Sequence, residues 1–236
     1  MFEHAVHAVY LRTMVIMFKH QIQMKKLLSL SAAAFLAVAC GQGTLDATDA
    51  QDAAQGGQTL TVDAAASGIE WYGHKPFVES YGHAGTLNIS EGLVGVENGA
   101  LVSGSFALDM NSIVCMDEAL PQEKKDYLVG HLKSADFFAV DSFAFAQFDI
   151  TNVEMQEGEN NALVSGNLTM RGVTNNIQFP ANVTVTDSVV TLTAPQFNID
   201  RKQWGVMYAS TSILDLAKDN LISDDLGIKI TVTAKL

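Results

Sequence analysis

From Thr59 to the end of the chain, apolar and polar residues alternate in short runs that are separated by turn-forming residues. The clearest runs place every second residue on one apolar face, as from Ile177 to Val185 and from Ile228 to Leu236. Alternation of this kind predicts antiparallel strands that bury one face. Turn sequences such as Glu97-Asn98-Gly99 and Asp187-Ser188 lie between the runs, so we expect hairpins in up-and-down order. About eight or more such strands close most simply into an all-β barrel without free edges.

One segment in the middle of the chain departs from this alternation and is predicted to be helical. Pro121 suits a first helical position, and Leu128 and Leu132 lie one turn apart on one face. Phe137 and Phe138 then close the segment as a large apolar pair. We expect a short helix that caps one end of the β-structure. A sharper hypothesis is that this helix and its aromatic residues also border a ligand cavity.

Two further local features are predicted. Residues Ile213–Lys218 are expected to form a second short helix before the last strand. Pro180 lies within a strand pattern, and proline lacks the amide hydrogen that a strand ladder uses, so we expect a bulge or a strand end there.

The residues before the alternating region are typical of an export signal. Met24-Lys25-Lys26 is a short basic stretch, and Leu27–Leu36 is apolar but too short to span a bilayer comfortably. We therefore predict a signal peptide at residues 24–39, cleaved before Cys40. Met24 is expected to be the true start, so residues 1–23 are interpreted as an extension introduced in gene calling.

Cys40 leaves two interpretations open. Leu36–Cys40 looks like a bacterial lipobox, in which the cysteine is acylated, although Ala37 stands where leucine is usual. Ala37-Val38-Ala39 also fits ordinary signal peptidase, which would cut the same bond. We favour a lipid anchor at Cys40, and Gly41 indicates sorting to the outer membrane. With the lipid, the protein is expected in the bacterial cell envelope, on the periplasmic side of the outer membrane. Without the lipid, it is expected to be a soluble protein that is periplasmic or secreted.

Composition separates a tether from a folded domain. Residues 40–58 are predicted to be a flexible tether, because they are small or polar with Leu45 as their only large apolar residue. A single domain is expected over residues 59–236. If Cys40 carries a lipid, Cys115 has no disulfide partner and is expected to be a buried, inert thiol.

Charge and motif content argue against several kinds of function. The formal net charge of −12 argues against nucleic acid as a partner and against a polybasic membrane patch. His74, His83 and His131 are scattered without metal-ligand spacing. The sequence also lacks a nucleophile-elbow motif (Gly-x-Ser-x-Gly) and a phosphate-binding glycine loop. We therefore expect no metal, no cofactor and no enzymatic activity, with an enzyme that acts on a lipid kept as an alternative.

Two arginines each have two interpretations. Arg201 is expected to form a structural ion pair with Asp200 at a strand end, and the alternative is that it binds a ligand head group. Arg171 carries the same ambiguity.

Large apolar residues are more numerous than the interior of a narrow barrel needs. A barrel of about eight strands either fills its interior with side chains or holds one slim ligand. Composition alone favours the filled interior, which would make the protein a structural or interaction lipoprotein of the envelope. The residues concerned are Phe106, Phe137, Phe138, Phe143, Phe145, Phe148, Met170, Phe197 and Trp204.

Four sequence blocks resemble, in order and spacing, those of one protein family. The most specific is His131–Phe138, which reads His-Leu-Lys-Ser-Ala-Asp-Phe-Phe. The others are Asp109–Ile113, Gly166–Thr174 and Phe197–Gly205. Over about residues 59–236 the chain is similar to the YceI-like family of lipid- and polyisoprenoid-binding proteins.

This resemblance implies a lipocalin-like barrel with a long apolar tunnel that takes isoprenoid or fatty chains. It implies a protein that binds, and by extension carries, an apolar chain lipid such as a polyisoprenoid or an isoprenoid quinone in the cell envelope. The family's His-Ser pair is missing from residues 65–71, which leaves the ligand's identity open. A homodimer is also left open. The ligand-binding residues implied are Leu128, Leu132, Phe137 and Phe138 at the mouth, Phe106, Phe148, Met170 and Trp204 along the wall, and His131, Arg171 and Arg201 at a polar head group.

Overall fold

The computed structural model of the protein describes residues 43–213 and 215–235. The predicted extension over residues 1–23, the signal peptide at 24–39 and the lipidation site Cys40 lie outside the described residues. In the part of the chain that the structure describes, no helix has the length and apolar character that crossing a membrane requires.

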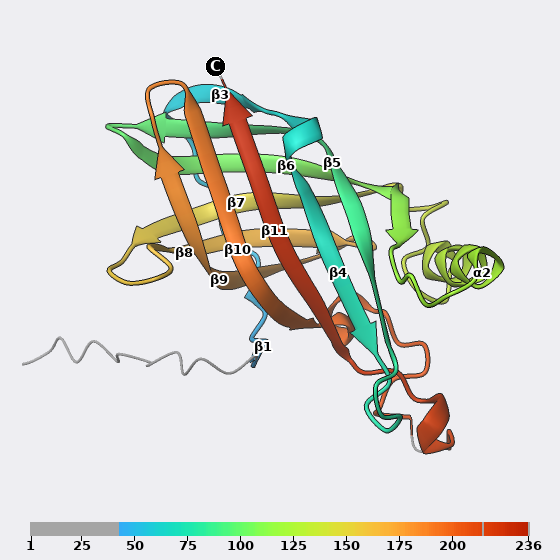
Figure 1. The fold of residues 1–236 in the computed structure, drawn as a ribbon. Helices are drawn as coiled ribbons and strands as arrows, with labels where there is room; N and C mark the ends of the chain where they lie inside the picture. Colours follow the sequence, from blue (N-terminus) through green and yellow to red (C-terminus); the bar gives the residue numbers. More distant parts are fainter. Residues whose placement is uncertain (1–42, 214, 236) are drawn as a thin grey trace, which may run out of the picture. The chain divides into compact units, whose positions relative to one another are not determined.

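Strands dominate the described chain and pair in up-and-down order (Figure 1). From β4 to β11 each strand is antiparallel to the next, and pairing of β11 with β3 and β4 closes the sheet. Because β3 and β4 share one position between β5 and β11, the closed barrel has eight positions. The predicted antiparallel, lipocalin-like barrel is therefore confirmed. Its strands are β3 (Gln58–Val62), β4 (Gly68–His74), β5 (Gly82–Glu97), β6 (Ala100–Cys115), β7 (Phe145–Met155), β8 (Ala162–Met170), β9 (Val173–Val185), β10 (Val189–Asp200) and β11 (Asp225–Lys235).

Alternation along each strand decides which side chains enter the interior. In β5, Leu87 and Ile89 are buried, whereas Asn88 and Ser90 are exposed. Burial of such apolar side chains stabilises the barrel by roughly 25 cal/mol per Å² removed from water. The buried apolar residues of all strands form one core cluster. Cys115 at the end of β6 is buried and free, as expected.

The seam between β9 and β10 is closed only in part by direct pairing. Their ladder ends at Thr193 opposite Asn182. Beyond it, β1 (Thr44–Leu45) runs parallel to β10 and β2 (Thr48–Asp49) runs antiparallel to β9. Pro180 lies within β9 but outside the part of β9 that pairs with β10. The missing amide hydrogen of proline therefore removes no hydrogen bond between these two strands. The strand continues through Pro180, so the predicted bulge or strand end is not found there.

The described part of the predicted tether packs on the barrel. The backbone N–H of Gln51 donates to Asn167 Oδ1 at 3.0 Å, and Asn167 Nδ2 donates to the Gln51 carbonyl at 2.6 Å. Ala54 N donates to the carbonyl of Ile150 at 2.8 Å. The prediction of a flexible tether over residues 40–58 is therefore wrong for these residues, because backbone hydrogen bonds hold a segment that has little apolar surface to bury.

The predicted central helix is present as α2 (Gln122–Lys133), between β6 and β7 and beside one end of the barrel (Figure 1). Pro121, predicted at the first helical position, is instead the N-cap residue, and the helix begins one residue later at Gln122. At the other end, the N–H of Ser134 donates to the carbonyls of Gly130 and His131. The helix thus begins and ends close to where its sequence signals lie.

The predicted second helix over Ile213–Lys218 is not formed by the described residues of that segment, which exclude Leu214. Ser210 Oγ accepts a hydrogen bond from the Ser212 N–H at 3.2 Å, which fixes a turn just before the segment. Such side-chain bonds to the backbone compete with helix formation. The remaining short elements are 3₁₀ turns: η1 (Ala64–Ala66), η2 (Arg201–Trp204) and η3 (Lys218–Asn220).

Candidate ligand cavity

The interior of the barrel holds a cavity of about 880 Å³. Its deep part is lined by core residues of the strands, among them Leu192 and Val232. Its outer part is bordered by the turn after β4, by α2 and by the segment that follows η2. Side chains therefore do not fill the barrel completely.

Aromatic side chains from four strands line one side of the cavity in succession. The ring centroids of Phe106 and Phe148 lie 6.4 Å apart, those of Phe148 and Phe179 lie 5.7 Å apart, and Phe179 stacks on Phe197 at 4.7 Å. Gly166 in β8 makes room for this wall, since a Cβ atom there would lie 2.2 Å from Phe148 Cζ. The result is a continuous apolar surface from β6 to β10.

Residues of α2 and the loop after it form the mouth. The ring of His131 packs edge-on against Phe137 at 5.1 Å and against Tyr208 at 4.6 Å. Its Nε2 atom lies 3.4 Å from Asp136 Oδ2. Arg171 donates to the carbonyls of Ala135, at 3.0 Å, and Phe137. The two aromatic contacts and the Arg171 bonds hold the mouth segment in place.

Nine of the eleven predicted ligand-binding residues line the cavity, and two do not. Arg171 lies outside the lining, and its Nη1 donates to backbone carbonyls of the mouth segment, which agrees with the structural role that the sequence left open. Trp204 is fully buried outside the lining, where its Nε1 donates to the carbonyl of Leu168 at 2.9 Å. The nine lining residues are Phe106, Leu128, His131, Leu132, Phe137, Phe138, Phe148, Met170 and Arg201.

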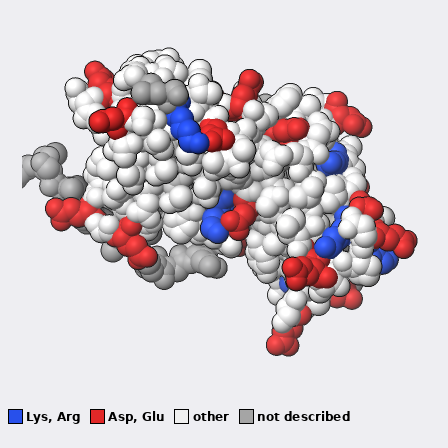
Figure 2. All heavy atoms as spheres, turned by 45° about the horizontal axis from the view of Figure 1, so that its top comes forward, with Lys and Arg blue, Asp and Glu red and all other residues white. Residues whose placement is uncertain are grey.

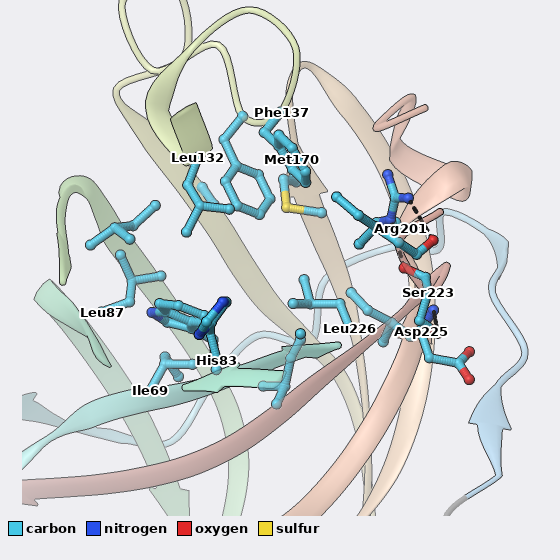
Figure 3. Close-up of a pocket in the computed structure, with 18 of the residues that line it drawn as sticks. Ile69, His83, Leu87, Leu132, Phe137, Met170, Arg201, Ser223, Asp225 and Leu226 are labelled. Carbon is cyan, nitrogen blue, oxygen red and sulfur yellow. Dashed lines mark hydrogen bonds between the residues drawn. The ribbon is translucent and has the colours of Figure 1, made fainter. Parts of the chain in front are cut away.

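Arg201 lines the cavity, yet its hydrogen-bond donors are engaged by the protein. Nε donates to the carbonyl of Ser223 at 3.0 Å (Figure 3), and the two terminal nitrogens donate to Val206 at 2.8 Å and Ile222 at 3.3 Å. The side chain is only 4% exposed, and burial lowers the pKa of Arg201 against the opposing effect of Asp224. A structural role therefore accounts for this arginine.

The predicted ion pair between Asp200 and Arg201 is replaced by other partners. Arg201 lies 3.4 Å from Asp224 Oδ1, and Asp200 accepts the backbone N–H of Lys202 at 3.0 Å. Lys202 also lies 3.1 Å from Asp224 Oδ2, and this hydrogen bond raises the pKa of Lys202. Burial acts to raise the pKa of Asp224, but hydrogen bonds led by that of Thr211 lower it overall.

Strands β4 and β5 supply a wall that the sequence-based list of site residues omitted. Ile69 and Trp71 of β4 line it, as do His83 and Leu87 of β5; Figure 3 shows Ile69, His83 and Leu87 together, across the cavity from Phe137. The alternation of Ile69 with Trp71 was a usable signal for this face. Trp71 Nε1 is buried without an acceptor among the described residues, which costs about 1–3 kcal/mol.

The outer surface differs from the apolar interior. Figure 2 shows acidic side chains spread over one face of the molecule, several of them beside Lys or Arg. Two ion pairs join strand or turn residues on the outside, Lys229 with Glu70 at 2.8 Å and Lys235 with Asp63 at 2.6 Å. No group of three or more potential metal ligands occurs among residues 43–213 and 215–235.

A closed antiparallel barrel with an apolar cavity places the protein in the lipocalin-like class of all-β folds. Within that class, the chain belongs to the family described as the YceI-like domain, whose model matches residues 42–234. The resemblance seen in the four sequence blocks is thereby confirmed.

Two solved structures share the fold at low sequence identity. BcnA of Burkholderia cenocepacia aligns with a TM-score of 0.55 and 17% identity, covering 74% of this chain and 99% of its own. A polyisoprenoid binding domain from Saccharophagus degradans, implicated in plant cell wall breakdown, aligns with a TM-score of 0.52 and 17% identity, covering 75% and 97%. No curated protein matches the sequence at a significant level.

Proposed function

We propose that this protein binds an apolar chain lipid, such as a polyisoprenoid or an isoprenoid quinone, inside its barrel and carries it within the bacterial cell envelope. The observation that supports this most is the cavity of about 880 Å³ with its aromatic wall. Cavities that bind small ligands commonly measure about 300–1,000 Å³ and are lined mainly by apolar side chains. A chain lipid suits such a site because most of its length needs no polar partner.

Burial of methylene groups would supply the affinity. Each CH₂ group removed from water contributes roughly 0.8 kcal/mol, so ten of them contribute roughly 8 kcal/mol. The loss of translational and rotational freedom on association costs an estimated 4–15 kcal/mol, which is about as large as the gain from ten methylene groups. The proposed ligand therefore has a long chain, because short apolar molecules would not offset that cost.

The relatives agree with this ligand class. The chain belongs to the YceI-like family, and the Saccharophagus degradans domain that shares its fold is described as polyisoprenoid-binding. We extend that class to this protein because its own cavity is apolar along the strands.

The first experiment identifies the ligand. Protein lacking only Cys40 is purified from its native envelope, and the organic extract is analysed by mass spectrometry. A polyprenyl, quinone or fatty species at a one-to-one ratio to protein supports the proposal and names the ligand. A clean extract, repeated after incubation with envelope lipids, refutes it and favours a structural lipoprotein.

A pair of variants on β7 tests the site. Phe148 lines the cavity, whereas Phe145 on the same strand is 54% exposed and does not line it. Phe148→Asp is expected to abolish lipid binding, because it places a carboxylate in the apolar wall. Phe145→Asp is the matched control and is expected to bind normally.

Because Phe148→Asp can also impair folding, circular dichroism is recorded for both variants. Leu128→Asp, at the half-buried mouth, is a milder second variant with the same expected loss. Full binding by folded Phe148→Asp and Leu128→Asp would place the ligand elsewhere and refute the site.

The proposed location is the bacterial envelope, with a membrane anchor at Cys40. The basic and apolar stretches of residues 24–36 and the lipobox-like Leu36–Cys40 support it. Mass spectrometry of the mature N-terminus tests it: a diacylated Cys40 is expected, and an unmodified Cys40 would make the protein a soluble one of the same compartment.

A further inference from the structure

His83 is a polar side chain on the cavity wall that β4 and β5 supply, where Ile69, Trp71 and Leu87 are apolar neighbours. It projects from β5 beside Leu87 and Ile69 (Figure 3). The register between β4 and β5 pairs the rings of His83 and Trp71 each with a residue that has no side chain. Gly73 of β4 lies directly opposite His83, and Gly85 of β5 lies opposite Trp71. Tyr81 packs edge-on against one part of the imidazole at 4.9 Å between ring centroids, and the cross-strand glycine leaves the side toward the cavity open to a ligand.

Asp117 fixes the orientation of this imidazole from outside the cavity. His83 Nδ1 lies 3.0 Å from Asp117 Oδ2, and the side chains are 16% and 23% exposed. Asp117 is not among the lining residues. The hydrogen bond with His83 is the main cause that lowers the pKa of Asp117, and the Ala119 N–H adds to it. Asp117 is therefore a carboxylate at neutral pH and accepts a hydrogen bond from the Nδ1–H group of His83.

The other ring nitrogen is left with a lone pair. A neutral histidine carries one proton, and the hydrogen bond made by one nitrogen decides the role of the other. With Nδ1–H bonded to Asp117, Nε2 of His83 is an acceptor. The hydrogen bond that His83 makes with the described residues is at Nδ1, and its ring lines the cavity. Arg201 differs, because carbonyls occupy its donors, and Nε2 of His131 lies close to Asp136.

We propose that His83, oriented by Asp117, is a recognition subsite for a hydroxyl group on the head of the chain lipid. This inference rests on the proposed function, since it assigns the polar end of a ligand in the same cavity. An alcohol or a phenol donates a hydrogen bond to Nε2. A ketone, an ether or a hydrocarbon offers no donor, so the subsite selects hydroxyl-bearing chains among lipids of equal length.

Two probes with the same chain test the subsite: geranylgeraniol and its methyl ether, titrated into the full barrel domain and followed by calorimetry. The native protein is expected to bind the alcohol about 2- to 12-fold more tightly, the range of one neutral hydrogen bond. His83→Phe keeps a ring of similar size without nitrogen. It is expected to bring the ratio of the two affinities close to one while the ether still binds.

Asp117→Asn gives a readout that a merely structural role would not change. Asp117 Oδ1 accepts the Ala119 N–H at 3.0 Å, so the amide oxygen of asparagine keeps that place and its NH₂ faces His83. The amide then donates to Nδ1, the ring proton moves to Nε2, and the subsite becomes a donor. The preference for the alcohol is expected to disappear. Asp136→Asn, beside His131, is the matched control and is expected to keep it.

The outcomes separate this inference from the proposed function. Equal binding of both probes by the native protein, or tighter binding of the ether, overturns the hydroxyl subsite and leaves lipid binding in place. A ratio that persists in both His83→Phe and Asp117→Asn also overturns the subsite. If the protein binds neither probe and no chain lipid from the envelope, the proposed function is refuted, and the subsite is refuted with it.

Discussion

Arg201→Met is expected to destabilise the barrel by about 3–5 kcal/mol, because it leaves buried acceptors without a donor. The guanidinium satisfies the carbonyls of Ser223, Val206 and Ile222, and it lies 3.4 Å from Asp224. Each of three orphaned carbonyls costs about 1 kcal/mol or more. Loss of the cation beside a buried carboxylate adds to this. Methionine keeps most of the apolar contact with the cavity, so the charge and the hydrogen bonds carry the difference.

Urea unfolding followed by tryptophan fluorescence measures this loss. With a slope of roughly 2–3 kcal/mol per molar urea, the midpoint should fall by about 1–2.5 M. Lys202→Met is the matched control, because Lys202 is 31% exposed and contacts the same Asp224. Its expected cost is about 1 kcal/mol or less.

A double variant checks the cause. Since Arg201→Met leaves Asp224 short of a cation, adding Asp224→Asn should cost less than the sum of the two single changes. A loss below about 1 kcal/mol for Arg201→Met would refute the reasoning. It would mean that the carbonyls find water when the arginine is absent, and that the guanidinium is free for a ligand.

Two further predictions concern packing and pH. Gly166→Ala should lower the free energy of unfolding by about 1–3 kcal/mol and weaken lipid binding, because the added methyl group pushes Phe148 toward the cavity. Gly130→Ala is the control, because there is open space around Gly130, and it should stabilise α2. Urea unfolding and lipid titration measure both, and unchanged binding by Gly166→Ala would contradict the account of the wall. For Asp224, whose pKa is lowered from 3.8 in the folded protein, the carboxylate stabilises the fold above about pH 4, and this contribution is lost as the pH falls through the lowered value. The free energy of unfolding of Asp224→Asn should therefore fall less than that of the native protein between about pH 5 and pH 2, and equal pH profiles would contradict this.

Alternation predicted the barrel because burial on one face of a strand has a period of two in the sequence. The family resemblance implied Phe106 and Phe148 on the inner wall, and both line the cavity. Trp204 is a wall residue that the resemblance implied and that does not line the cavity. It lies in η2, beyond the end of β10, so the alternation no longer determined where its side chain points.

Contacts between distant residues could not be predicted in this way. Arg201 pairs with Asp224, and His83 with Asp117, which lie 23 and 34 positions apart in the sequence. No local pattern links such partners, because the closure of the barrel and the loop before α2 bring them together. The neighbour in sequence, Asp200, was the natural but wrong choice for Arg201.

The strands β1 and β2 pair with the barrel, so the folded unit begins earlier in the chain than Thr59, where the hydrophobic alternation begins. Residues 44–51 supply backbone partners for β10 at Ile199 and for β9 at Asn176, and they cover the buried side chain of Asn167. A chain cut just before Gln58 would keep every strand of the barrel, yet it would expose that seam as an open sheet edge. Open edges recruit strands from other molecules, so the short N-terminal segment also protects the barrel from self-association.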